Sequence, residues 1–177
     1  MQDTLGARER ARRCLYDGPS ITFGRVVVGD RGRQDESVLK GVNPLLSGDL
    51  LKVLDDMGHG DVLVLADRKF PAHSSGRPVI RVSTGVVDAV EAVLSVFPLD
   101  SFVEKPLGRM QIGDDPTATN DTQLAVLESA RSLDPHAGEF EVVPRYEVYE
   151  RARAAYAVVQ TIETAPYCVF LLTKGVV

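Results

Sequence analysis

The sequence predicts an α/β fold, a single layered domain over residues 39–177 that follows an extension over residues 1–38. Short apolar runs typical of buried strands alternate with segments whose apolar residues repeat at helical spacing. Such alternation is typical of helices packed on a sheet. The composition agrees, because 44% of the residues are hydrophobic and 25% are charged, as in most globular domains. A chain of 177 residues is long enough to bury a core without disulfides or metals.

The first helix and strand of the domain are indicated by their ends. Ser47 can cap a helix in which Leu50 and Leu54 share a face, and Gly58 suits the position just after that helix. The apolar run Asp61–Ala66 then predicts a buried strand. The elements that follow are a loop at 67–78, a strand at 79–82, an amphipathic helix at 86–97 and a strand that contains Met110.

The second half of the domain repeats this alternation. Leu124, Leu127 and Ala130 lie on one side of a helix predicted over residues 122–132. The remaining elements are a strand at 139–143, a charged helix at 145–155, and strands at 156–160 and 169–172 that pair late in the chain. The whole pattern predicts one layered α/β domain.

Residues 1–38 have a different composition from the rest of the chain. They contain seven Arg, no Lys and five Gly, and no apolar stripe that a helix could pack. One interpretation is a flexible N-terminal extension. The other is a mis-assigned start, with the natural beginning near Val38, and an intact-mass measurement of the natively expressed protein distinguishes the two.

Charge and cysteine content exclude several classes of protein. Lys plus Arg number 20 and Asp plus Glu number 25, so the net charge of −5 lacks the basic surface of a nucleic-acid or anionic-membrane binder. No apolar run approaches the roughly 18–20 residues that span a bilayer. The two cysteines form no CxxC pair, which argues against a structural zinc site and fits a reducing compartment. The sequence therefore predicts a cytoplasmic protein with a small-molecule or protein partner.

The first candidate functional residue is His59, which lies between Gly58 and Gly60. Flanking glycines let the backbone turn sharply and leave the imidazole uncovered. An exposed histidine titrates near neutral pH and can both donate and accept a proton. The alternative is a surface histidine at an ordinary helix end.

Asp67 is the second candidate, because it directly follows the first buried strand. A carboxylate at the carboxyl end of such a strand points into the crevice where α/β proteins bind ligands. The alternative is an aspartate that only forms the turn of the following loop. His73 could join His59 and Asp67 around a metal, but their spacing matches no metal signature, so no metal is predicted.

Arg145 and Tyr149 form the third candidate, because a spacing of four residues places them on one helix face. A tyrosine hydroxyl can donate to or accept from a sugar hydroxyl. The alternative is that the tyrosines, including Tyr167, are core residues and that the charges pair along the helix. No phosphate-binding loop, dinucleotide fingerprint or GxSxG elbow is present, so the sequence gives no support for a kinase, dehydrogenase or serine-hydrolase function.

Together these segments resemble the family of L-fucose mutarotases and D-ribose pyranases. The motifs that carry the resemblance are LKGVNPLLS (39–47), LLKVLDDMGHGD (50–61), LADRKFPAHS (65–74), PLDSFVE (98–104), YERA (149–152) and LLTKGV (171–176). They cover essentially all of residues 39–177 in matching order and spacing. The GHGD, FPAHS and YERA motifs resemble the fucose branch. The pyranase branch typically has Thr in place of Gly60 and lacks YERA.

The resemblance implies a role for each site residue. His59 matches the general acid, and Tyr149 matches the tyrosine of YER that contacts the substrate. The positions implied to bind or line the sugar are Asp67, Asp100, Met110, Arg145, Tyr167 and Val169. One of these departs from the family, because Val169 replaces the asparagine of a YGN motif and Cys168 replaces its glycine. Loss of a buried amide typically weakens binding by roughly 1–3 kcal/mol, so the identity of the sugar depends on this position.

The implied activity is interconversion of the α and β anomers of L-fucose or a similar aldose. Ring opening needs one proton on the ring oxygen and one proton off the anomeric hydroxyl, which requires no metal or other cofactor. The resemblance also implies a ring-like homo-oligomer, commonly a decamer, whose pockets are completed across subunit contacts. The alternatives are a pyranase that interconverts ring sizes of ribose and a non-catalytic sugar-binding protein.

Overall fold

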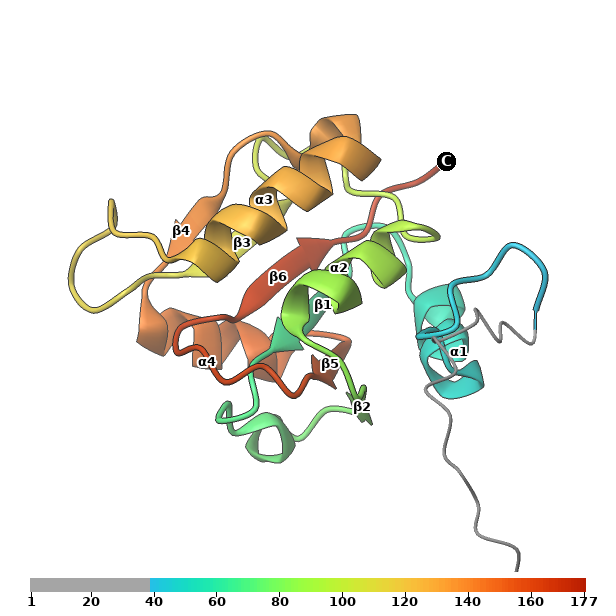
Figure 1. Cartoon of the computed structure of the whole chain (residues 1–177), viewed down its shortest axis with the longest axis horizontal. Helices are drawn as coiled ribbons and strands as arrows, with labels where there is room; N and C mark the ends of the chain where they lie inside the picture. Colours follow the sequence, from blue (N-terminus) through green and yellow to red (C-terminus); the bar gives the residue numbers. More distant parts are fainter. Residues whose placement is uncertain (1–38) are drawn as a thin grey trace, which may run out of the picture. The chain divides into compact units, whose positions relative to one another are not determined.

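A computed structural model describes residues 39–177, which form one six-stranded sheet with helices on both faces (Figure 1). The strand order is β2-β5-β1-β6-β3-β4. The strands are β1 (Val62–Ala66), β2 (Val79–Arg81), β3 (Leu107–Met110), β4 (Glu141–Val143), β5 (Ala157–Gln160) and β6 (Phe170–Thr173). The helices are α1 (Gly48–Asp56), α2 (Val86–Leu94), α3 (Asp121–Leu133) and α4 (Arg145–Ala154), with short 3-10 turns at Ala72–Ser75 and Pro135–Ala137. The predicted α/β class is confirmed.

The direction of the strands determines which loops meet. β1 pairs in parallel with β5 and antiparallel with β6, and β3 pairs in parallel with β4 and antiparallel with β6. β2 is parallel to β5, so β6 alone runs opposite to the other five strands of the described region. The carboxyl ends of β1, β3, β4 and β5 therefore lie along one edge of the sheet.

The core lies on both faces of the sheet. Leu63 and Leu65 of β1 face the cluster that includes the buried side of α2, whereas Val64 and Ala66 face the cluster that includes α4. Side chains alternate across a strand, so a central strand covered on both faces must be apolar throughout. This explains the uninterrupted apolar run from which the strand was predicted.

The predicted start of α1 is confirmed, because the Ser47 side chain accepts a hydrogen bond from the Leu50 N–H at 3.3 Å. The next predicted helix, α2, is shorter than the 86–97 range and ends at Leu94. The sharp turn after α1 is at Gly60, which has a φ of +83°, and not at Gly58.

The prediction that the last two strands pair with each other is wrong. β1 lies between β5 and β6 and hydrogen-bonds to both. Sequence proximity suggested a local pairing, but β5 instead follows a helix and returns in parallel beside β1. The proposed extension at residues 1–38 lies outside the described residues. Within residues 39–177, no helix is both long enough and apolar enough to cross a membrane.

Candidate functional site

The structure places the predicted site residues in two groups at opposite edges of the sheet. His59 precedes β1 and Asp100 precedes β3, so both lie where these strands begin. The other residues lie where strands end or β6 begins, and they are Asp67, Met110, Arg145, Tyr149, Tyr167 and Val169. The two groups are separated by the length of β1, which is about 16 Å at about 3.3 Å per residue.

The loop that carries His59 is fixed to the end of β6. The Gly60 N–H donates to the Lys174 carbonyl at 2.8 Å, and the positive φ of Gly60 permits that turn. The Lys174 ammonium donates to the carbonyls of Leu54 and Met57 at 2.5 and 2.6 Å. Carbonyls at the end of a helix such as α1 have no N–H partner within the helix, and Lys174 supplies one. These hydrogen bonds join the end of α1, the loop of His59 and the end of β6.

Asp100 contacts the imidazole of His59 directly. Both carboxylate oxygens lie 3.1 Å from His59 Nε2, and the Asp100 side chain is 3% exposed whereas the His59 side chain is 46% exposed. The Phe102 N–H, which donates to Asp100 at 2.9 Å, lowers the pKa of that carboxyl, and His59 lowers it further. An ionised Asp100 accepts the Nε2 hydrogen, which leaves Nδ1 as the nitrogen free for proton transfer. Within one subunit Asp100 therefore faces His59 and not the other predicted sugar-binding residues.

The position of Asp100 depends on a close approach of two backbone segments. The Asp100 N–H donates to the Thr173 carbonyl at 3.0 Å, and the Gly175 N–H donates to the Pro98 carbonyl at 2.9 Å. A Cβ at Gly175 would collide with the main chain of Leu99 and Asp100. Glycine is therefore required beside the acidic partner of His59. A cavity of about 570 Å³ opens next to His59, between α1 and residues 174–177.

At the opposite edge, Asp67 is buried and bonded to its own turn. Its carboxylate accepts the N–H groups of Lys69 and Phe70 at 2.8 and 3.0 Å. Burial raises the pKa of Asp67, and the N–H donors of Lys69, Phe70 and Cys168 oppose that rise. The turn-forming alternative from the sequence is therefore present in the structure, whether or not the carboxylate also contacts a ligand.

Arg145 and Tyr167 line a cavity of about 280 Å³ at this edge. Two polar residues that sequence reasoning missed, Gln111 and Asp114, line the same cavity. Gln111 directly follows Met110 at the carboxyl end of β3, and Asp114 comes three residues later, so their place after a strand was the signal that could have found them. The cavity thus combines a guanidinium, a carboxylate, an amide and phenol groups, which can all hydrogen-bond to hydroxyl groups of a ligand.

Tyr149 is half-buried beside this cavity. Its ring lies 5.7 Å from that of Phe70 and 6.3 Å from that of Tyr146. Phe70, Tyr146 and Tyr149 also line a second cavity of about 280 Å³ with Glu150. Tyr149 therefore packs against other aromatic rings and also lines the wall of a pocket.

Met110 and Val169 are buried in the apolar cluster at this end of the sheet. They are 4% and 1% exposed, and the Met110 N–H donates to the Val169 carbonyl at 2.9 Å. The side chain of Val169 lies in the apolar cluster beneath α4 and supplies no hydrogen-bonding group. Any polar contact at this point must come from neighbouring residues.

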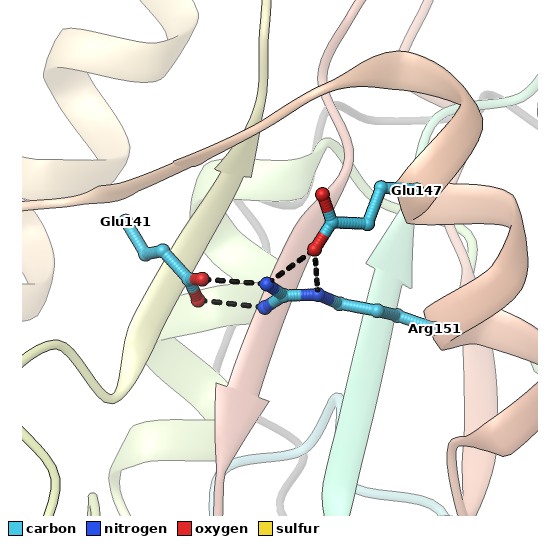
Figure 2. A network of polar contacts seen from close by, with 3 residues as sticks. All are labelled: Glu141, Glu147 and Arg151. Carbon is cyan, nitrogen blue, oxygen red and sulfur yellow. Dashed lines mark hydrogen bonds and ion pairs between the residues drawn. The ribbon is translucent and has the colours of Figure 1, made fainter.

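The position of α4, which carries Arg145 and Tyr149, is fixed by an ion-pair network (Figure 2). Arg151 donates through both terminal nitrogens to the two oxygens of Glu141 on β4, at 2.7 and 2.6 Å. It also donates to Glu147 one turn earlier, at 2.9 and 2.6 Å. Since α4 buries only Val148 and Ala152, this bidentate pair supplements a small apolar contact.

The remaining histidine from the sequence analysis, His73, does not join the site. Its Nε2 lies 3.5 Å from Arg81 on the surface. Among residues 39–177, no three His, Cys, Asp or Glu side chains lie close enough together to hold a metal ion.

Residues 40–177 match the sequence profile of the RbsD / FucU transport protein family. The chain belongs to this family. Among RbsD / FucU relatives, the chain is 41% identical over 140 residues to the L-fucose mutarotase of Actinobacillus pleuropneumoniae serotype 5b (strain L20), covering 78% of this chain and 97% of that protein.

Two solved structures of RbsD / FucU relatives have the same fold. FucU from Bifidobacterium longum superposes with a TM-score of 0.73 at 37% identity, covering 78% of this chain and 99% of that one. The fucose mutarotase from Streptococcus pneumoniae, solved in complex with L-fucose, superposes with a TM-score of 0.69 at 32% identity over the same shares.

Proposed function

We propose that this chain is an aldose mutarotase that interconverts the α and β anomers of L-fucose. The observation that carries the proposal is the imidazole of His59, half-exposed and oriented through Nε2 by a buried carboxylate. It is supported by the relatives named as L-fucose mutarotases and by the relative solved with L-fucose.

The reaction moves two protons and breaks one carbon–oxygen bond. A proton is added to the ring oxygen while another leaves the anomeric hydroxyl, and the bond between the anomeric carbon and the ring oxygen breaks. The resulting aldehyde rotates about its bond to the next carbon. The hydroxyl formed from the ring oxygen then attacks the other face of the aldehyde. It loses its proton as the ring closes, and the aldehyde oxygen gains one to become the anomeric hydroxyl. No electrons are transferred, so acid/base groups alone suffice.

We assign the acid/base role to Nδ1 of His59. Asp100 holds the hydrogen of Nε2, stabilises the imidazolium that forms when Nδ1 takes a proton, and fixes the direction of the ring. We assign the holding of sugar hydroxyls to Arg145 and Tyr167, which line the cavity, and to Tyr149 and Asp67 from the same end of the sheet. We assign apolar contacts with the sugar to Met110 and Val169, which belong to the neighbouring apolar cluster.

These two sets of residues work together only if they come from different subunits. The length of β1 separates His59 from the Arg145–Tyr167 cavity within one chain, which is farther than a monosaccharide reaches. We propose that His59 of one subunit faces this cavity on its neighbour in a ring-like homo-oligomer. A shared site of this kind makes assembly a requirement for activity.

The test is exchange between the α and β anomeric protons of L-fucose, measured by NMR saturation transfer. Wild-type protein should raise the exchange rate above the protein-free rate. His59→Ala should lower this protein-dependent increase at least about 100-fold. His136→Ala is the matched control, because His136 also lies 3.1 Å from a carboxylate, that of Asp134, with its side chain 50% exposed. That variant should retain full exchange.

The other outcomes distinguish the alternatives. Full exchange in His59→Ala would refute the assignment of the proton donor. Absence of exchange with L-fucose, together with ring-size exchange of D-ribose, would indicate a pyranase. A sugar that binds without any exchange would indicate a binding protein.

A further inference from the structure

One side chain in α3 contacts the backbone of two residues assigned to the sugar site. Gln123 is fully buried at 0% exposure. Its side-chain nitrogen donates to the carbonyl oxygens of Met110 and Tyr167, each at 2.9 Å. These two carbonyls belong to segments that are far apart in the sequence, and the Gln123 amide bonds to both of them.

Both polar atoms of the Gln123 amide have hydrogen-bond partners. Its two N–H groups match the two carbonyls, and its oxygen accepts from the Arg109 guanidinium at 3.3 Å. Arg109 is itself 3% exposed and also donates to the Pro116 carbonyl at 2.9 Å. A buried amide with every group satisfied specifies one arrangement of its neighbours.

The backbone at Tyr167 needs such support. Tyr167 has a φ of +63°, and no other non-glycine residue in the described part of the chain has a positive φ. A side chain strains this conformation, so it persists only where surrounding contacts hold it. The N-cap residue of α3, Asn120, adds a second contact by donating to the Pro166 carbonyl at 3.2 Å.

We propose that Gln123 is a positioning residue that sets where Tyr167 and Met110 meet the sugar. Gln123 contacts neither the cavity beside His59 nor the cavity lined by Arg145, so it acts through the backbone of these two residues. This role rests on the proposed function. It predicts that loss of the amide weakens sugar binding and leaves proton transfer by His59 intact.

The test is Gln123→Met, which keeps the length and helix preference of the side chain and removes its hydrogen bonds. The KM for L-fucose should rise about tenfold, whereas kcat should stay within about threefold. A merely structural role would give a different pattern. In a partly unfolded sample, the apparent kcat falls in proportion to the fraction of unfolded protein, and KM stays unchanged. That pattern, or an unchanged KM, would overturn the proposal.

Two further variants keep the test decisive. Val126→Ala removes a fully buried side chain one turn along the same helix, so it should lower the melting temperature without changing KM. Asn120→Asp keeps the capping oxygen and loses the side-chain donor to the Pro166 carbonyl and the Cys168 sulfur, so it should raise KM by a smaller factor than Gln123→Met with α3 intact.

A readout without sugar separates this proposal from the proposed function. Cys168 follows Tyr167, and its thiol is fully buried with a pKa raised by burial to about 11. In a Cys14→Ser background, a thiol reagent should label Cys168 several-fold faster in Gln123→Met than in wild type or Val126→Ala. Unchanged labelling would overturn the role of Gln123, whereas a wild-type protein inactive on L-fucose would overturn only the proposed function.

Discussion

At the scale of single residues, the chemistry depends on the pair formed by His59 and Asp100. The sequence places them 41 positions apart, and no local pattern connects them. The structure joins them through the close approach of residues 98–100 to residues 173–175. The buried carboxylate determines which nitrogen of the exposed imidazole is free.

Asp100→Asn tests this dependence. The amide can still accept from Phe102, but its N–H₂ group can donate to Nε2 and so shift the imidazole hydrogen to Nδ1. We expect kcat for L-fucose exchange to fall about 100-fold with little change in KM. Asp55→Asn is the control, because Asp55 is an exposed carboxylate that lines the cavity beside His59 without contacting the imidazole. An equal loss in both variants would show a general charge effect and contradict the pairing.

At the scale of secondary-structure elements, the orientation of α4 decides how Arg145 and Tyr149 are presented. The helix has a polar surface and buries little, so its contact with β4 depends on the Arg151–Glu141 pair shown in Figure 2. Arg151 lowers the pKa of Glu141 by hydrogen bonding. The folded state therefore binds the Glu141 proton less tightly than the unfolded state does.

This linkage predicts a pH-dependent contribution to stability. Glu141→Gln should lower the free energy of unfolding at pH 7 by about 1 kcal/mol, equivalent to about 3 °C in melting temperature, since the pair is partly exposed. The stabilisation exists above the usual carboxyl pKa and is lost as the pH falls through the lowered pKa of Glu141. Melting curves of wild type and variant should therefore converge in acid. Glu139→Gln, whose carboxylate is mostly exposed, should match wild type throughout. A difference that persists in acid would exclude the ion pair as its cause.

Much of this element-scale arrangement was predictable, because local signals determine it. The apolar run of β1, the cap at Ser47 and the placement of Asp67 at a strand end all follow from adjacent residues. The position of β6 between β1 and β3 was not predictable, since strand order depends on contacts distant in sequence. The role of Gln123 was hidden for a different reason, because a glutamine on a helix looks solvent-exposed until its neighbours are known.

At the scale of the whole molecule, activity should require contact between subunits. The His59 and Arg145 groups lie at opposite sheet edges, so each proposed site takes one group from each of two neighbours. His59→Ala and Arg145→Ala should each be inactive, and co-assembly at equal amounts should restore about a quarter of wild-type activity.

The control distinguishes shared sites from sites within one subunit. Wild type co-assembled equally with the double variant should also keep about a quarter of the activity if sites are shared, but about half if they are not. Failure of the two single variants to complement each other would contradict the shared site.

The central place of β6 has a consequence for the synthesis of the protein. Figure 1 shows this strand, the last in chain order, between β1 and β3. Until it leaves the ribosome, the nascent chain can form only the half-sheets β2-β5-β1 and β3-β4, each with an open hydrogen-bonding edge. Folding of the sheet is thus completed by the last strand of the described region, and a chain that stops before Phe170 exposes two edges that favour aggregation.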